Sequence, residues 1–209
     1  MEQGSIILLN GTSSSGKSLI AKALQEIYDD YYIHTGIDHY LERVPEKFHL
    51  ASDGKNPSTA EGLLWVTPDG GKHVSEIRIG PAALRLFSGM YRAYAALATM
   101  GNNIIIDDVI FDPRVLKDAV RILHPFNVLF VGVKCPFEIA EQREQERGDR
   151  TLGLVQAHYD LVHSHGTYDL EIDTSILTSL ECANQIKNRF QNGPGPEAIQ
   201  KLQTILQTM

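Results

Sequence analysis

The chain has 209 residues, 43% of them hydrophobic and 22% charged, which indicates an ordinary soluble globular protein with one α/β domain and room for a small insertion. Its 26 acidic residues outnumber 19 basic ones, and the net charge of −7 disfavours a general affinity for nucleic acid or anionic membranes. A small neutral or locally complemented substrate fits this balance better. No stretch approaches the roughly 18 apolar residues of a membrane span.

The two cysteines, Cys135 and Cys182, lack the spacing of metal ligands. They indicate reduced core thiols in a cytoplasmic protein, and a disulfide between them is the alternative. The N-terminus has no basic region followed by a cleavable apolar segment, which agrees with a cytoplasmic protein.

A phosphate-binding pattern, G-x-x-x-x-G-K-[ST], occurs near the start of the chain. It follows the apolar run Ser5–Asn10 and precedes residues 19–27, which have helical spacing, so it has the strand, loop and helix context that the motif requires. Lys17 would bring a mobile positive charge to the β- and γ-phosphates, and the Ser18 hydroxyl would be a magnesium ligand. A chance match in a serine- and glycine-rich turn is the alternative, at about one in a hundred. The expected nucleotide-binding residues are Gly11, Thr12, Ser13, Ser14, Ser15, Gly16, Lys17 and Ser18.

Tyr31–His34 is expected to form a second strand, and Asp38 follows it closely. Open α/β sheets bind ligands beyond the ends of their strands, so Asp38 is a candidate for a catalytic role. An N-cap for a helix that begins near His39 explains Asp38 at least as well by position alone.

Residues 45–80 have poor periodicity and dense turn signals, and we interpret them as a substrate-side insertion. Within it, Leu63–Val66 and His73–Ile77 are expected to form a small hairpin. Trp65 either anchors a ligand or, as is commoner for an aromatic side chain, covers the core.

A long helix is expected from Gly80 to about Met100, with a C-cap at Gly101–Asn103. An apolar stripe at three- and four-residue spacing marks its core face: Ala83, Phe87, Met90, Tyr94 and Leu97.

The isoleucine-rich run Ile104–Val109 is expected to be a buried strand ending in two aspartates, which is typical of the position that holds magnesium in P-loop enzymes. Asp107 is the favoured metal-binding residue of the two, directly or through water. The alternative is that the aspartate pair caps the next helix, for which Asp112-Pro113 is a competing start signal.

A helix over Pro113–Leu123 and a buried strand over Phe126–Val133 are expected next, followed by a helix from Glu138 to Arg147. Arg143 and Arg147 alternate with glutamates there, a pattern usually found on a solvated helix face. Gly148 breaks the helix and leaves Arg150 on a loop. In a phosphoryl-transfer enzyme, a lid arginine on such a loop would close over the γ-phosphate.

The remaining elements are a helix over Leu154–His163, a final strand over Tyr168–Thr174 and a helix over Thr178–Phe190. The C-terminal end of the final strand is expected near the adenine of the bound nucleotide. His163 and His165 are expected to be structural. Residues 191–209 form a tail with a short amphipathic segment that packs on its own domain or on a neighbouring copy.

These elements predict an α/β protein with three layers, in which helices flank a five-stranded parallel sheet. Residues 1–190 would form this domain, with the insertion at 45–80 and a lid at 147–155. Residues 191–209 would form the C-terminal tail.

The chain resembles the chloramphenicol phosphotransferase family of P-loop kinases, which is related to shikimate and nucleoside kinases. The resemblance covers Ile6 to about Arg189 and rests on several separated segments in the same order. These are residues 7–11 entering the phosphate loop, Gly36-Ile37-Asp38, Ile104–Val109, Arg147-Gly148-Asp149-Arg150, and Tyr168–Thr174 followed by Glu181-Cys182-Ala183.

This resemblance implies an ATP-dependent and magnesium-dependent kinase that acts on a small-molecule alcohol, as in the phosphorylation of chloramphenicol in antibiotic resistance. It also implies a P-loop kinase fold. Asp38 would be the general base, Arg150 the lid arginine and Arg143 the arginine that stacks on adenine, with Arg147 as a further nucleotide-binding residue. Lys17 and Arg150 would neutralise charge on the transferred group.

The match is poor over residues 45–80 and after Arg189, so phosphoryl transfer is better supported than chloramphenicol as the acceptor. Other acceptors are a nucleoside, a metabolite or another antibiotic. A nucleotide-binding regulatory module without acceptor chemistry is the alternative from another class.

Overall fold

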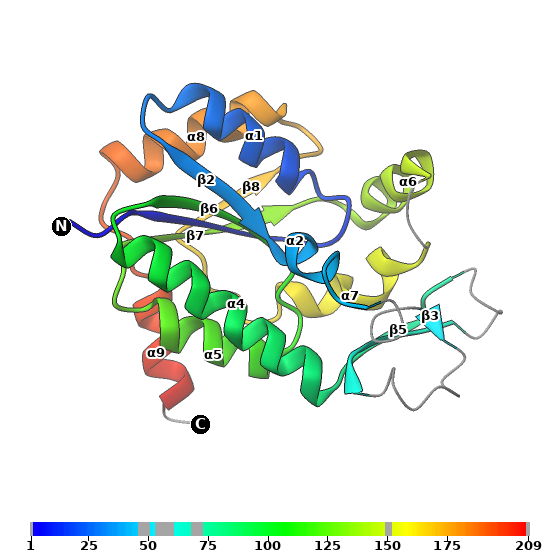
Figure 1. Cartoon of the computed structure of the whole chain (residues 1–209). Helices are drawn as coiled ribbons and strands as arrows, with labels where there is room; N and C mark the ends of the chain where they lie inside the picture. Colours follow the sequence, from blue (N-terminus) through cyan, green and yellow to red (C-terminus); the bar gives the residue numbers. More distant parts are fainter. Residues whose placement is uncertain (1, 46–50, 53–60, 68–72, 149–151, 208–209) are drawn as a thin grey trace.

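A five-stranded parallel sheet in the order β2-β6-β1-β7-β8 forms the centre of the computed structural model (Figure 1). The structure describes residues 2–45, 51–52, 61–67, 73–148 and 152–207. The strands are β1 (Ile6–Asn10), β2 (Tyr32–Gly36), β6 (Asn103–Asp108), β7 (Val128–Lys134) and β8 (Leu170–Asp173). This sheet confirms the predicted fold class, with boundaries that differ from the expected ones by a few residues.

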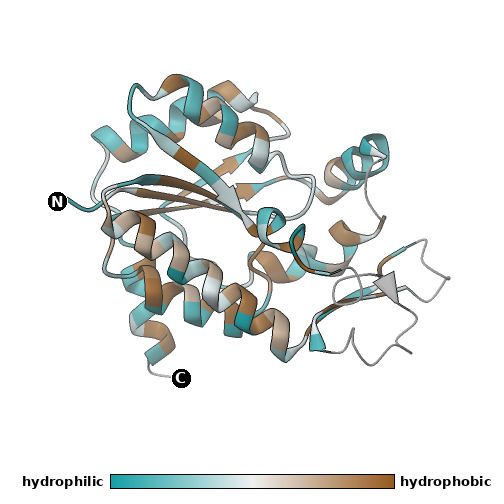
Figure 2. Cartoon of the chain, viewed as in Figure 1, coloured by the Kyte–Doolittle hydropathy of each residue, from teal (hydrophilic) through white to brown (hydrophobic). Residues whose placement is uncertain are grey.

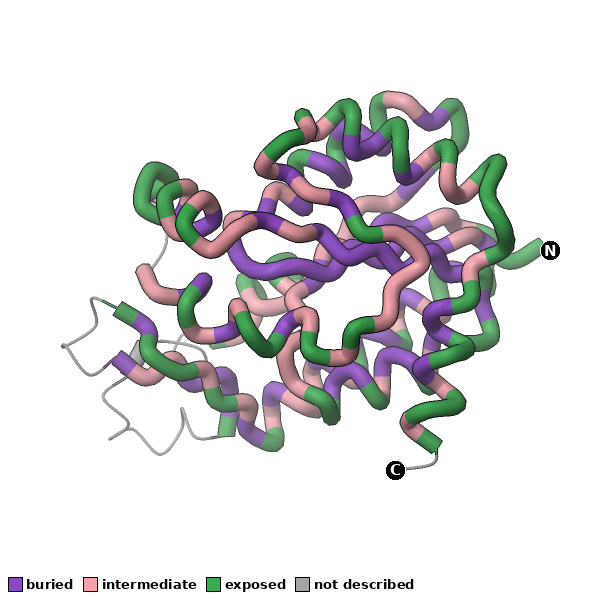
Figure 3. Tube along the Cα trace, turned by 180° about the vertical axis from the view of Figure 1, so that it is seen from behind, coloured by how far each residue is buried: buried purple, intermediate pink, exposed green. Residues whose placement is uncertain are grey.

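The central strands are buried on both faces, because helices cover both sides of the sheet. Their side chains alternate between two hydrophobic clusters: Ile6 and Leu8 face one, and Ile7 and Leu9 face the other. Figure 2 shows hydrophobic stretches in the central strands, and Figure 3 shows that these strands form the buried centre of the molecule.

Two helices cover the face that contains Ile7 and Leu9: α1 (Lys17–Ile27) and α8 (Ser179–Asn192). The opposite face packs against α4 (Pro81–Thr99), α5 (Pro113–Leu123) and α9 (Ala198–Gln207). Figure 1 shows these two helical layers on either side of the sheet, which is the three-layer arrangement expected from the sequence.

The C-terminal segment packs on its own domain. The sequence had left open whether it packs there or on a neighbouring copy. Ile199 and Leu202 of α9 are buried in the same cluster as α4 and α5. The helix start is fixed by Asp169, whose carboxylate accepts hydrogen bonds from the backbone N–H groups of Glu197 (2.7 Å) and Ala198 (3.0 Å).

Helix α4 buries four of the five residues in the predicted apolar stripe, from Ala83 to Tyr94. The prediction is wrong for Leu97, which is 36% exposed, while Ala98 is fully buried. The core-facing side of a 19-residue helix drifts relative to a strict three- and four-residue spacing. Tyr91, which lies outside the predicted stripe, is also fully buried.

The remaining described elements gather beyond the carboxyl ends of the central strands (Figure 1). They are α2 (Ile37–Leu41), α6 (Phe137–Arg147), α7 (Leu154–Val162), and a second sheet of β3 (Ala51–Ser52), β4 (Leu63–Val66) and β5 (Glu76–Ile79).

The predicted hairpin exists, because β4 and β5 pair antiparallel with Leu63 opposite Ile79. Its second strand begins at Glu76 rather than at His73, because His73 forms an isolated bridge with Leu152 instead. Trp65 is partly buried against the main core, as expected for an aromatic side chain that covers it.

Cys135 and Cys182 are both buried and free, which confirms the predicted core thiols and rules out the disulfide. Within the described ranges, no helix has the length and apolarity needed to cross a membrane.

Candidate active site

The phosphate-binding loop connects the end of β1 to the start of α1, in the strand, loop and helix context predicted from the motif. Gly16 is the N-cap of α1 and has a φ of 92°, a left-handed conformation that glycine adopts without steric cost. Among the residues that the structure describes, no side chain caps the helix at this end. The first backbone N–H groups of α1 and the positive end of its dipole therefore face the loop. This arrangement favours the binding of anions.

Lys17 and Ser18, from the first turn of α1, both meet Asp107 at the end of β6. The Ser18 hydroxyl donates a 2.5 Å hydrogen bond to Oδ2 of Asp107, and Nζ of Lys17 lies 3.9 Å from Oδ1. Nζ of Lys17 also donates a 2.8 Å hydrogen bond to the backbone carbonyl of Thr12, and the lysine is only 6% exposed. The fold thus brings together three predicted site residues from two distant segments.

Asp107 faces the loop because of its register in the sheet. It pairs with Leu9, whose side chain points toward the α1 layer. Burial alone would raise the pKa of the Asp107 carboxyl, but contacts with His34, Lys17 and Ser18 outweigh burial and hold this pKa below its ordinary value. Asp107 is therefore ionised at neutral pH, as a metal ligand must be.

Asp108 points into the opposite layer, beneath α4. Its buried carboxylate accepts hydrogen bonds from the Tyr91 hydroxyl and from the backbone N–H of Val109 (2.7 Å). Burial is the main reason that the pKa of Asp108 rises to about 6. The structure thus separates the two adjacent aspartates: Asp107 belongs to the phosphate loop, and Asp108 to the packing of α4.

The alternative that these aspartates cap the following helix is wrong. The N-cap of α5 is Asp112, whose carboxylate accepts a 2.8 Å hydrogen bond from the backbone N–H of Arg114.

Asp38 lies in the first turn of α2, directly after β2. The N-cap of α2 is Gly36 rather than Asp38, so the capping explanation for Asp38 is wrong. Gly36 pairs with Asp107, and a Cβ at this position would lie 2.0 Å from the Asp107 carbonyl oxygen, so the close approach of β2 and β6 requires glycine. The exposed Asp38 follows two residues after this contact, at the same edge of the sheet as the phosphate loop.

Arg143 of α6 is joined to the phosphate loop through Thr174, at the end of β8. Its guanidinium donates hydrogen bonds to Oγ1 (3.0 Å) and to the carbonyl oxygen (2.8 Å) of Thr174. The Thr174 hydroxyl in turn donates a 2.9 Å hydrogen bond to the carbonyl of Ser15. The interpretation of a solvated helix face is therefore wrong for Arg143.

The sequence also predicted Arg147 as a nucleotide-binding residue and Arg150 as the lid arginine. Arg147 is the exposed last residue of α6. Arg150 lies outside the described residues, together with residues 149 and 151 of the predicted lid.

Glu144 is a buried residue that sequence analysis missed, because it was grouped with the exposed charges of α6. It is 3% exposed, and its carboxylate accepts hydrogen bonds from the backbone N–H groups of Gly153 (2.8 Å) and Val155 (3.0 Å). Glu144 therefore caps the start of α7 from a neighbouring helix. A charged residue within a charged helical pattern gives no sequence signal for this role.

Two further polar residues connect the phosphate loop with α7. The side-chain amide of Asn10 donates hydrogen bonds to the Val162 carbonyl (2.9 Å) and the Tyr168 hydroxyl (2.9 Å). Nδ1 of His158 lies 3.1 Å from the Thr12 hydroxyl. Asn10 is a polar residue at the end of an apolar strand, and this position is a sequence signal for a special role. The sequence holds no such signal for His158, which is one of several polar residues in a predicted helix.

His163 and His165 have the structural role that the sequence predicted. Nδ1 of His163 lies 2.7 Å from the Tyr168 hydroxyl, and the His165 ring stacks on Phe130 with 5.3 Å between centroids. Burial lowers the pKa of each histidine to about 4.

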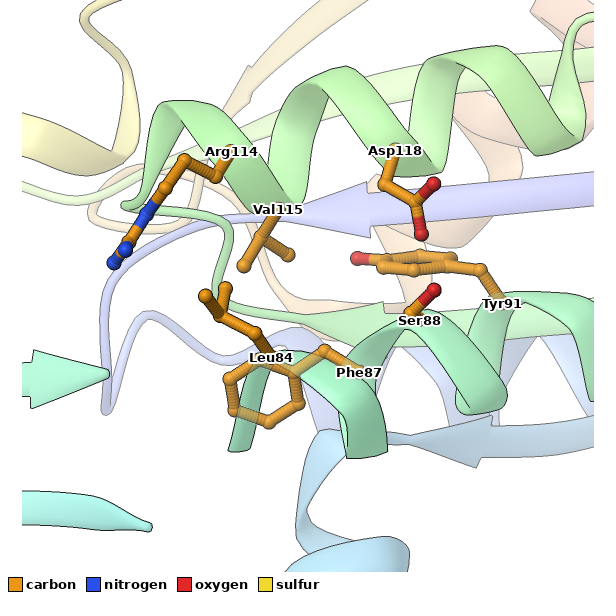
Figure 4. Close-up of a pocket in the computed structure, with 7 residues that line it drawn as sticks. All are labelled: Leu84, Phe87, Ser88, Tyr91, Arg114, Val115 and Asp118. Atoms are coloured by element: carbon orange, nitrogen blue, oxygen red, sulfur yellow. The ribbon is translucent and has the colours of Figure 1, made fainter. Parts of the chain in front are cut away.

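A cavity of about 200 Å³ lies between α4 and α5 (Figure 4). Its charged side chains are already paired: Arg114 with Asp112 at 2.7 Å, and Asp118 with Arg121 at 2.6 Å. The cavity lies in the helical layer on the other side of the sheet from α1, so it is not the phosphate site. The lining residues are Leu84, Phe87, Ser88, Tyr91, Arg114, Val115 and Asp118.

Comparison with known proteins shows a family match over almost the whole chain. Residues 4–191 match the sequence model described as "Chloramphenicol phosphotransferase-like protein". A protein of Mycobacterium tuberculosis strain H37Rv, named "Putative O-phosphotransferase", is 34% identical over 209 residues, which cover 97% of this chain and 89% of that protein. The strain CDC 1551 protein of the same description has the same identity and coverage.

Solved structures with this fold include several kinases. The Mycobacterium tuberculosis APS kinase, in complex with AMPPNP and APS, has a TM-score of 0.61 at 10% identity, over 90% of this chain and 98% of that one. The Deinococcus radiodurans tunicamycin resistance protein has a TM-score of 0.60 at 15% identity, over 90% and 96%. Shikimate kinase of Acinetobacter baumannii, in complex with shikimate, has a TM-score of 0.55 at 14% identity, over 90% and 93%.

Proposed function

Since this chain belongs to the chloramphenicol phosphotransferase-like family of P-loop phosphotransferases, we propose that it transfers the γ-phosphoryl group of ATP to the hydroxyl of a small-molecule alcohol. One observation carries the proposal: Lys17 and Ser18 of the phosphate loop converge on Asp107, at the sheet edge where Asp38 also lies. The APS kinase that shares this fold was solved with AMPPNP, which supports ATP as the nucleotide.

The loop offers several groups for the phosphates of the nucleotide. Lys17 supplies a positive charge, and the N-terminus of α1 supplies backbone N–H groups. Among the described residues, the buried hydroxyls of Ser13 and Ser15 have no hydrogen-bond partner, which is costly for a polar group and calls for an explanation such as a bound ligand. Contacts with phosphate oxygens would relieve that cost.

Ser18 and Asp107 would hold a magnesium ion. A hydroxyl and an ionised carboxylate are hard oxygen donors of the kind this cation prefers, and they already touch each other. Magnesium would neutralise charge on the β- and γ-phosphates.

Asp38 would act as the general base. As the substrate oxygen forms its bond to the γ-phosphorus, the bond from that phosphorus to the ADP oxygen breaks, and the hydroxyl proton passes to the Asp38 carboxylate. Lys17 and Arg150 would stabilise charge on the transferred group, while Arg143 would stack on the adenine and Arg147 would contribute to nucleotide binding.

The test is a screen of alcohols with the purified full-length protein, ATP and magnesium. We expect ADP release to increase with one class of alcohol, and mass spectrometry to find that alcohol carrying one added phosphate. The panel should contain chloramphenicol, other hydroxylated antibiotics, nucleosides and sugar-like metabolites. Tight ATP binding without a phosphorylated product from any alcohol would contradict the proposal and favour a nucleotide-binding regulator.

A further inference from the structure

His158 of α7 contacts the phosphate loop through the hydroxyl of Thr12. The residue is 4% exposed, its Nδ1 lies 3.1 Å from the Thr12 hydroxyl, and its ring stacks on Phe111 with 5.7 Å between centroids. The carbonyl of the same threonine accepts the 2.8 Å hydrogen bond from Nζ of Lys17. Two successive contacts therefore connect His158 with the lysine of the phosphate motif.

The imidazole is uncharged in this position. Burial and the nearby positive charge of Lys17 lower the pKa of His158 to about 3. A neutral imidazole has one N–H and one acceptor nitrogen, so it shares one hydrogen bond with a hydroxyl in either tautomer. The ring therefore orients Thr12 without adding a second cation beside Lys17.

Helix α7 holds His158 firmly because both of its ends are anchored. Glu144 caps its first turn through Gly153 and Val155, and Asn10 binds the Val162 carbonyl in its last turn at 2.9 Å. Asn10 is also the residue immediately before the phosphate motif. Helix α7 and the loop are thus joined at two points, through Asn10 and through the pair of His158 and Thr12.

We propose that His158 is a positioning residue of the phosphate loop: its hydrogen bond fixes Thr12, and the Thr12 carbonyl orients Lys17 toward the phosphates of a nucleotide. The inference rests on the proposed function, because it requires a nucleotide as the ligand of the loop. The ring also stacks on Phe111, between β6 and α5, so His158 joins the phosphate loop to that segment.

Calorimetric titration of the full-length protein with magnesium-ADP tests this role without an acceptor alcohol. The variant His158→Phe keeps an aromatic ring against Phe111 but loses the hydrogen bond, and Thr12→Val replaces the hydroxyl by a methyl group of similar size. We expect each to weaken magnesium-ADP binding by about three- to tenfold, the range for one lost hydrogen bond. Their combination should weaken it no further, because both remove the same contact. His158→Gln, whose amide can bond to the hydroxyl, should recover most of the affinity.

Equal magnesium-ADP affinity in the wild type, His158→Phe and Thr12→Val would overturn the inference and leave the proposed function intact. Equal loss of affinity in His158→Phe and His158→Gln would also overturn it, because the effect would then come from packing. If His158→Phe does not fold, His158→Leu, which also lacks the hydrogen bond, replaces it in the same comparison with Thr12→Val and His158→Gln. No binding of magnesium-ADP to the folded wild type would overturn the proposed function and the inference together.

Discussion

The hydroxyl of Ser18 donates a 2.5 Å hydrogen bond to Oδ2 of Asp107, across 89 residues of sequence. This contact joins the phosphate loop to the end of the neighbouring strand, so two oxygen donors lie side by side at the edge of the sheet. The following predictions depend on that arrangement and on the buried polar contacts that support it.

Replacement of the Asp107 carboxylate should weaken magnesium binding more than it weakens nucleotide binding. We expect Asp107→Asn to raise the magnesium concentration needed for half-maximal ATP affinity by about 10- to 100-fold, because a charged ligand is lost. Titration of magnesium at fixed ATP measures this shift. Glu171→Gln, at an exposed position in β8, is the control, and the same shift in both variants would contradict the metal role.

Loss of the Lys17 charge should weaken nucleotide binding directly. We expect Lys17→Ala to reduce ATP affinity by about 10- to 100-fold, because the lysine makes a charge-assisted contact with phosphate. Lys22→Ala, five residues later on the exposed side of α1, should bind ATP as the wild type does. Unchanged affinity in Lys17→Ala would show that the nucleotide binds elsewhere.

The buried cap of α7 should be important for stability. In Glu144→Ala, the N–H groups of Gly153 and Val155 lose their partner in a buried setting, so we expect a loss of about 2–4 kcal/mol in the free energy of unfolding. Urea denaturation measures it. Glu146→Ala, two residues further on at an exposed position, should change stability by less than about 0.5 kcal/mol.

Acid should destabilise the protein through its buried histidines. Because the pKa of His163 is about 4 in the folded chain and about 6.5 in the unfolded chain, the unfolded state binds more protons between these values. The contribution of His163 to stability is therefore greatest above pH 6.5 and falls as the pH decreases toward 4. The contribution of His163 is on the order of 1 kcal/mol at pH 5, after allowance for partial solvent screening.

The variant His163→Gln tests this, since the amide can still bond to Tyr168 but does not titrate. Its unfolding free energy should fall less than that of the wild type between pH 7 and pH 5. His124→Gln, at an exposed position after α5, should behave like the wild type. An equally steep fall in His163→Gln would refute the explanation.

The parallel sheet and the phosphate loop were predictable because their signals are local. Each central strand is a short apolar run, and the loop motif lies between one such run and a helix of regular periodicity. The choice between Asp107 and Asp108 depended on a non-local fact, namely that α1 packs on the sheet face that contains Leu9. Alternation along the strand then sends the two aspartates into opposite layers.

Glu144 and His158 could not be recognised in the sequence for a related reason. Both lie in helices where polar residues are ordinarily exposed, and only tertiary packing buries them. The partner of Glu144 is the start of the next helix, α7, and the partner of His158 is Thr12, 146 residues away in sequence. No rule of residue spacing connects either pair. Asp38 was predictable as a candidate because it follows a strand end, but its position in the first turn of α2 required the structure.

The most direct test of the proposed reaction compares the wild type with Asp38→Asn, using ATP, magnesium and the alcohol identified by the screen. Phosphorylated alcohol is measured by mass spectrometry, and ATP affinity by calorimetry. We predict that the wild type forms the product, and that Asp38→Asn binds ATP normally but forms almost none. Product formation by Asp38→Asn at most of the wild-type rate would exclude Asp38 as the base, and release of inorganic phosphate without any phosphorylated alcohol would contradict the transfer reaction itself.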